Sequence, residues 1–215
     1  MALAARERLV LFSDAVFAIA ITLLAIDLRL PVVAGGYDDA SLVAAVVALG
    51  PALLAYALSF FVIAMFWLGH LRTLRVVVRI DSIFIGLNLV FLAFVAIVPF
   101  PTSVVAMDGN LASATILYAL FGASLAVLSM LLWVYATRIG HLASERLTPE
   151  IARRVTYRTT IVPALFLVSI PVALVNTTLA RAIWIVAAPA QAFVSRRLHL
   201  DANLGLDGPA PPASL

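Results

Sequence analysis

The sequence predicts an all-α integral membrane protein, folded as a bundle of six membrane-spanning helices. Of its 215 residues, 64% are hydrophobic and 12% are charged, whereas a soluble domain is about half apolar and about one quarter charged. The apolar residues fall in long blocks of roughly 20, the length that a helix needs to cross a bilayer. A mean hydropathy of +1.13 agrees with this pattern. We therefore expect the lipid bilayer to surround most of the chain.

Connectors that are polar or contain proline separate the six blocks. Proline removes a backbone donor, so Pro51 is expected to divide a short lead-in helix from the second span, and the Pro-Phe-Pro of 99–101 to end the third. Thr148 and Pro149 predict the start of a short surface helix before the fifth span. The expected spans are 9–30, 52–71, 82–98, 111–136, 159–175 and 179–194.

These spans are expected to form one transmembrane domain over residues 1–200. The remaining segment, 201–215, is polar and proline-rich. Such a composition cannot bury enough apolar surface to fold, so a disordered tail is expected there.

Arginine gives the predicted orientation. All fourteen basic residues are Arg, and only Arg29 and Arg181 fall in the connectors of one side. The others flank the opposite ends of the spans, so the positive-inside rule places both termini in the cytoplasm, with the protein in the cell membrane. The apparent pI of about 9.8 therefore reflects topology, and no nucleic-acid partner is expected.

Several chemistries have no residues to support them. The chain has no cysteine, which excludes disulfides and thiolate metal sites. The three histidines, His70, His141 and His199, are too dispersed to predict a metal cluster. His141 and Glu145, four positions apart, are typical of a solvated helix face. We predict neither an enzyme nor a bound cofactor.

Asp14 is an ionisable residue within the first span, where a charge costs several kcal/mol and usually has a named partner. Trp67 and His70, at i and i+3, face one side of the second span at matching depth. Asp81 and Asn88 are further candidate partners. A structural clamp is the favoured interpretation, and a proton-coupling or pH-sensing Asp–His pair is the alternative. The sequence leaves the two open.

An aliphatic stripe runs along the first span on a different side from Asp14. At 100° per residue its members lie within about one third of the helix circumference, and Asp14 is about 140° from Ile19. The stripe therefore faces lipid, another subunit or a pore, and plain lipid contact or packing is the ordinary interpretation. Its members are Ala15, Ile19, Thr22, Leu23, Ile26 and Leu30.

Three segments resemble one known family in order along the chain. "RLVLFSD", residues 8–14, matches the RxxxFSD signature of the transmembrane protein 175 family, which comprises endosomal and lysosomal potassium channels and their prokaryotic relatives. "LAYALSFFVIAMFWLGH" resembles the second helix of that family, and "LNLVFLAFVAIVPFPT" resembles its third. The resemblance covers roughly the first hundred residues; beyond them, only the number of spans agrees.

The resemblance implies a passive potassium channel without the TVGYG filter, and the sequence indeed has no such segment. One six-span repeat per chain implies a homotetramer, with first helices lining the central pore. By position, Ile19 would form the hydrophobic constriction, where the family also uses leucine, with Thr22 as the pore threonine and Leu23 and Ile26 as further layers. The implied intracellular support comprises Arg8, Phe12, Ser13, Asp14, Trp67, His70 and Asn88.

A ring of aliphatic side chains cannot replace the hydration shell of potassium, so we expect it to act as a dewetting gate. Thr22 oxygens one turn away would discriminate between ions, and the expected selectivity is modest. The alternative function is a proton-conducting channel or proton-coupled transporter that uses Asp14 and His70.

Overall fold

The computed structural model describes residues 2–33, 35–144 and 147–185, and the regular structure there is helical apart from one isolated bridge between Val77 and Ala143. Residues 177–185 are also helical. The helices, in chain order, are α1 (Ala2–Leu23) with a 3-10 extension (Leu24–Asp27), α2 (Asp39–Ala48), α3 (Gly50–Val76), α4 (Ser82–Ile97), α5 (Pro99–Asp108), α6 (Ala112–Val134) with a π-helical end (Tyr135–Ile139), α7 (Pro149–Thr159) and α8 (Ile161–Val175).

Five stretches of the described chain are long and apolar enough to cross a membrane. A helix of 27 residues is about 40 Å long, more than the roughly 30 Å hydrocarbon core. The all-helical membrane fold is thus confirmed. The sixth expected span, 179–194, is helical up to residue 185, and its remainder and the expected tail lie outside the described residues. The five stretches are Ala5–Ile26, Gly50–Val76, Ser82–Asp108, Ala112–Ile139 and Pro149–Val175.

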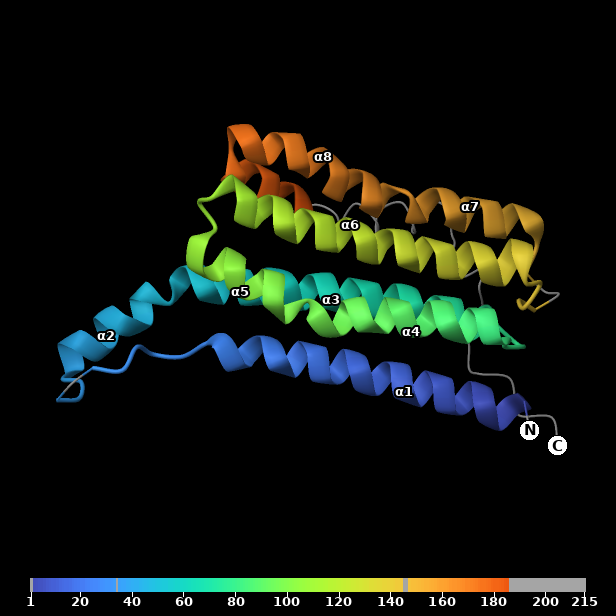
Figure 1. The fold of residues 1–215 in the computed structure, drawn as a ribbon, viewed down its shortest axis with the longest axis horizontal. Coiled ribbons are helices and arrows are strands. Elements are labelled where there is room, and N and C mark those ends of the chain that lie inside the picture. The colour runs from blue at the N-terminus through green and yellow to red at the C-terminus, as the bar shows by residue number, and fades with distance from the viewer. Residues whose placement is uncertain (1, 34, 145–146, 186–215) are drawn as a thin grey trace.

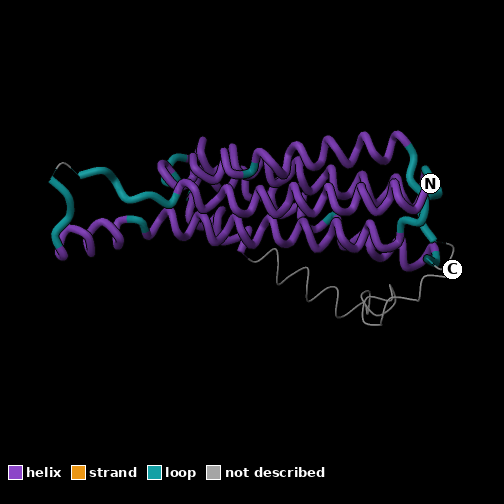
Figure 2. The backbone as a smooth tube through the Cα atoms, turned by 90° about the horizontal axis from the view of Figure 1, so that it is seen from below, coloured by secondary structure: helices purple, strands orange, loops and turns teal. Residues whose placement is uncertain are grey.

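The long helices run side by side in one elongated bundle (Figures 1 and 2). α1 forms one edge, packed on α3 and α4, while α6 packs on α4 and, most extensively, on α8. Short α2 projects beyond the end of the bundle (Figure 1) and contains no buried residue. α1 is therefore a peripheral helix of the single chain, with one side packed and one side open.

Prolines mark helix starts in this fold more often than helix ends. Pro51 lies in the first turn of α3, and α2 is the expected lead-in helix before it. Pro99, however, does not stop the third span at residue 98, as predicted, because α5 begins at that proline and the apolar stretch continues to Asp108. The first helical turn accepts proline because its N–H groups have no intrahelical partner.

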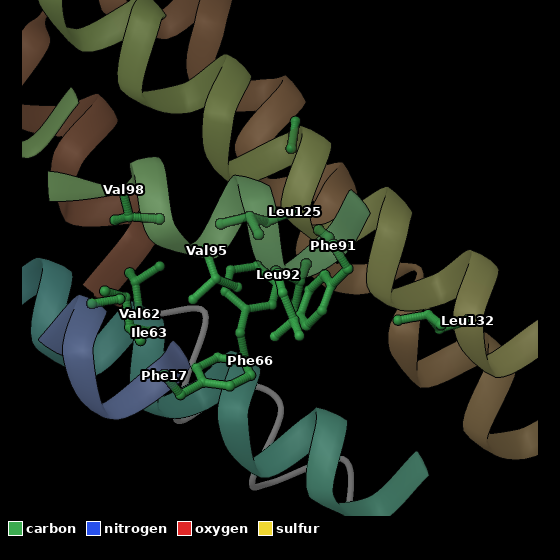
Figure 3. Packing of buried hydrophobic residues seen from close by; sticks show 14 of the residues in the cluster. Phe17, Val62, Ile63, Phe66, Phe91, Leu92, Val95, Val98, Leu125 and Leu132 are labelled. Carbon is green, nitrogen blue, oxygen red and sulfur yellow. The ribbon is translucent and has the colours of Figure 1, made fainter. Parts of the chain in front are cut away.

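The main hydrophobic core lies where α1, α3, α4 and α6 meet (Figure 3). Phe17 of α1 points toward α3 and α4, where Phe66 and Phe91 are also buried, and the ring centroids of Phe17 and Phe91 are 5.9 Å apart. Leu125 extends the same cluster onto α6. These contacts fix which side of α1 faces the rest of the chain.

Buried hydroxyl groups join three helices near the end of the bundle at which α2 projects. Thr102 of α5 donates to Ser59 Oγ of α3 at 2.8 Å, and Ser59 Oγ lies 2.9 Å from the Tyr118 hydroxyl of α6. Such side-chain hydrogen bonds stabilise helix association within a bilayer, where water offers no competing partner.

The two connectors at the opposite end of the bundle bind each other through their backbones. Val78 N–H donates to Leu142 C=O at 2.9 Å, and Ser144 N–H donates to Val76 C=O at 2.8 Å. This end also contains the start of α1, so most arginines of the described chain gather at one end, as the predicted topology requires.

Candidate ion pathway and its supporting contacts

α1 has a packed face and an exposed face. The packed face repeats every three or four residues, as one side of an α-helix does. The exposed face carries Ile19, of which 58% is accessible in the single chain, and Ile26, of which 47% is accessible. Thr22 and Leu23 are exposed between them. The buried residues are Leu9, Ser13, Phe17, Ala20 and Leu24.

Thr22 lies on the exposed face, and its hydroxyl group bonds its own helix. Its hydroxyl donates to the carbonyl oxygen of Ile19 at 2.8 Å. A threonine hydroxyl that bonds its own helix retains lone pairs that accept further bonds. The exposed face therefore combines bulky aliphatic groups with the hydroxyl oxygen of Thr22.

Asp14 binds α3 through Trp67. The indole Nε1 donates to Asp14 Oδ1 at 2.8 Å, and both side chains are half-buried. Ser13, adjacent on α1 and fully buried, binds a different helix: Asn88 Nδ2 of α4 donates to Ser13 Oγ at 3.1 Å. Two neighbouring polar residues thus connect α1 to α3 and α4.

His70 differs from the sequence expectation, because no hydrogen bond joins it to Asp14 in the described chain. The imidazole is 2% exposed and lies against two aromatic rings, with its centroid 5.8 Å from that of Phe17 and 5.3 Å from that of Phe91. Residues at i and i+3 differ by about 60° around the helix. That angle directs Trp67 to Asp14 and His70 into the core beside Phe17 and Phe91.

Asp81 is not a partner of Asp14 either. Its carboxylate caps α4 by accepting the Phe84 N–H at 2.8 Å, and it accepts the Tyr135 hydroxyl at 2.7 Å. These two hydrogen bonds, the first being the stronger influence, hold the pKa of Asp81 below its ordinary value of 3.8. Asp81 therefore fastens α4 to the end of α6.

Arg8 and Phe12, the remaining residues of the implied support, are exposed in the single chain. Arg6 makes the contact that sequence reasoning missed: its Nε and Nη2 donate to the carbonyl oxygens of Val77 and Leu74, each at 2.7 Å. A cation at the last carbonyls of a helix is favourable because those groups lack intrahelical partners. The only sequence feature that indicated this contact was the presence of an arginine near the start of α1.

Comparison with known proteins identifies the family. Residues 8–99 match the family described as endosomal/lysosomal potassium channel TMEM175. A potassium channel of Streptomyces collinus is 38% identical over 151 residues, which cover 68% of this chain and 72% of that protein. This chain belongs to the TMEM175 family. A second relative, a potassium channel of Chamaesiphon minutus, is 30% identical over 178 residues, or 80% of this chain and 86% of the relative.

The TMEM175 fold is also evident from solved structures. The crystal structure of a lysosomal potassium-selective channel TMEM175 homologue from Chamaesiphon minutus aligns with a TM-score of 0.72 and 26% identity, covering 90% of this chain and 98% of that one. A variant of the potassium channel MtTMEM175 in complex with a nanobody–MBP fusion protein aligns with a TM-score of 0.61 at 19% identity, covering 89% and 93% of the two chains, a likeness of fold alone. The family is one of channels and not of enzymes.

Proposed function

We propose that this TMEM175 protein assembles as a homotetramer that conducts potassium passively, with the exposed face of α1 lining the pore. Ile19 forms the constriction, and Thr22, Leu23 and Ile26 line the path beyond it. The observation that carries the proposal is the exposure of this face, since Ile19 and Ile26 are 58% and 47% accessible while the opposite face of the helix is packed.

Four Ile19 side chains around one axis would exclude water from the narrowest point, so hydration of the constriction would control conduction. Thr22 lies one turn away, and its oxygen atoms would partly replace the hydration shell of the ion there. Because this path offers few oxygen ligands and no carbonyl filter, we expect only a modest preference for potassium over sodium.

The arginine-rich end of the bundle faces the cytoplasm in this proposal, which places both termini there and the protein in the cell membrane. Three arginine-bearing segments lie at one end of the bundle, which supports this orientation: the start of α1, the end of α3 and the connector after α6. Arg6 joins the first to the end of α3, and backbone hydrogen bonds join the two connectors. Arg29 follows the opposite end of α1.

The alternative, proton conduction through Asp14 and His70, has less support. Asp14 accepts a hydrogen bond from Trp67, and the imidazole of His70 lies against the rings of Phe17 and Phe91. A proton relay needs a continuous series of donors and acceptors, and aromatic rings interrupt one here.

Purified protein in liposomes, loaded with potassium and diluted into sodium, is expected to release potassium without ATP or a partner ion. Ile19→Asn should raise the flux and lower the potassium-to-sodium ratio, because an amide hydrates the constriction. Val168→Asn, on an exposed part of α8, introduces the same polar group elsewhere and should leave both unchanged.

Equal flux and selectivity in the Ile19 and Val168 variants would exclude the proposed pore. Flux that follows a proton gradient in place of a potassium gradient, and that disappears in Asp14→Asn while the tetramer remains intact, would establish the alternative.

A further inference from the structure

Arg6 lies on the packed face of α1, before the segment that matches the TMEM175 family. It precedes the RxxxFSD signature by two positions, and the family match begins at residue 8. At about 100° per residue, Arg6 is about 20° from buried Ser13 and about 140° from exposed Ile19 around the helix. Arg6 thus extends the packed face by two turns toward the start of α1.

The acceptors of Arg6 are two backbone carbonyl groups at the end of α3. Leu74 lies in the last turn of α3 and Val77 follows the helix, and the carbonyl oxygen of each is 2.7 Å from a guanidinium nitrogen of Arg6. Because the guanidinium is planar, two hydrogen bonds from different nitrogen atoms fix its position more strictly than one bond does. The start of α1 is therefore held at a defined place against α3.

The segment that accepts these bonds is held in turn by the connector after α6. Val76 C=O accepts a backbone hydrogen bond and Val78 N–H donates one, each with a partner in residues 142–144. These bonds flank Val77 on both sides, so its carbonyl group keeps its position relative to α3 and α6. Arg6 therefore ties α1 to two connectors that are already joined to each other.

Arg6 and the pair Ser13 and Asp14 hold α1 at two levels along its axis. The step from Arg6 to Ser13 corresponds to about 11 Å along a helix. At the second level, Trp67 of α3 binds Asp14 and Asn88 of α4 binds Ser13. A helix held by polar contacts at one level can change its inclination to its neighbours, whereas contacts at two levels of one face oppose that change.

We propose that Arg6 is a positioning residue of the channel, which fixes the inclination of α1 and thereby how often the constriction at Ile19 is hydrated. This inference rests on the proposed function, in which four Ile19 side chains meet at the pore axis. Side chains that meet there cannot approach one another further, so a change in inclination separates them and admits water. Loss of the Arg6 hydrogen bonds therefore favours the conducting state.

Single-channel recording of the full-length protein in planar bilayers tests the effect on conduction. Arg6→Ala removes both hydrogen bonds and should raise the open probability about tenfold, the factor that corresponds to one hydrogen bond from a charged group. The constriction keeps its own side chains, so the unitary conductance and the potassium-to-sodium ratio should equal those of the wild type. Arg6→Lys retains a charged donor and should give an intermediate open probability.

Arg79→Ala is the matched control. Arg79 Nη2 donates to the carbonyl oxygen of His141 at 3.1 Å, so this bond also runs from an arginine to the backbone at the same end of the bundle, but it joins the two connectors. The variant removes the same charge and should keep the wild-type open probability, whatever its unfolding temperature. Equal changes in Arg6→Ala and Arg79→Ala would overturn the proposal.

A second measurement follows the inclination of α1 independently of conduction. The chain has no cysteine, so spin labels can be attached at Ala25→Cys, in the 3-10 extension of α1, and at Val175→Cys, at the end of α8. Both positions are exposed. In labelled protein diluted with unlabelled protein, pulsed electron paramagnetic resonance should give a broader distribution of the distance between the labels in Arg6→Ala, and an unchanged one in Arg79→Ala.

The outcomes for Arg6 can be separated from those for the pore. An unchanged distance distribution in Arg6→Ala would overturn the proposal, as would an unchanged open probability in a channel on which Ile19→Asn acts as expected. If Ile19→Asn has no effect, the proposed pore fails, and the label distances still decide whether Arg6 positions α1. If Arg6→Ala does not fold, Arg6→Lys decides the result in the same two measurements.

Discussion

The indole nitrogen of Trp67 lies 2.8 Å from Oδ1 of Asp14, so a donor on α3 holds the carboxylate of α1. Five residues after Asp14, Ile19 is exposed on another side of the same helix. The carboxyl group within the first span therefore belongs to the contacts that hold α1, and the aliphatic face takes no part in them.

Removing this hydrogen bond should destabilise the protein. A hydrogen bond to a charged group contributes about 1.5–3 kcal/mol, so Trp67→Phe, which removes the donor, and Asp14→Ala, which removes the acceptor, are each expected to lower the unfolding temperature of the purified protein. Because both substitutions break one interaction, the double variant should lose less than the sum of the two, with a coupling of about 0.5–3 kcal/mol. Additive losses would show that the two side chains do not act together.

Thr22→Val should lower the potassium-to-sodium flux ratio and leave the unfolding temperature unchanged. Among the described residues its hydroxyl bonds only the preceding turn, at Ile19, so the fold of that part of the chain does not need it. Ser124→Ala is the control, because the Ser124 hydroxyl likewise bonds its own helix at Leu120 but lies on α6. An unchanged flux ratio in Thr22→Val would remove this side chain from the ion path.

Gly122→Ala should destabilise the contact between α6 and α8. A Cβ there would meet the ring of Phe166 at 2.3 Å, and such overpacking costs about 1–3 kcal/mol. Gly86→Ala adds the same methyl group where nothing lies within 4 Å, and alanine's higher helix propensity should make it neutral or slightly stabilising. Equal unfolding temperatures for the two variants would contradict the close approach of Phe166 to α6.

Acid should weaken the end of the bundle at which Asp81 lies. Hydrogen bonds from Phe84 and Tyr135 hold the pKa of Asp81 below 3.8, so their stabilisation is present above that pH and is lost as the pH falls through the folded-state pKa. Asp81→Asn keeps a capping oxygen but cannot ionise. Its unfolding temperature should therefore fall less than that of the wild type between pH 6 and pH 3, and parallel curves would contradict this role.

The division of α1 into two faces followed from helical periodicity alone, because an angle of 140° between Asp14 and Ile19 does not depend on the neighbouring helices. Trp67 as the partner of Asp14 followed from matching depth. The position of His70 did not, because a rotation of about 60° decides whether a side chain reaches a carboxylate or an aromatic core. This rotation is set when the helices pack against one another, so it cannot be read from the sequence alone.

Two other features lay beyond sequence reasoning for different reasons. Pro99 is equally compatible with a helix end and with the first turn of a new helix. The apolar composition continues from α4 into α5, but it favours a new helix only when the two pack as one span. The bonds from Arg6 to the carbonyl groups of Leu74 and Val77 join residues about 70 positions apart. Periodicity within one helix carries no information on such contacts.

The polar contacts of α1 are distributed unevenly along its length. In the described chain, its side-chain hydrogen bonds to other helices and their connectors arise from Arg6, Ser13 and Asp14, whereas the part from Ala15 to Ile26 is held by apolar packing. A helix that is held near one end can be displaced most easily at its other end. A small tilt at the held end is thus amplified toward Ile26, about 18 Å farther along the axis than Asp14.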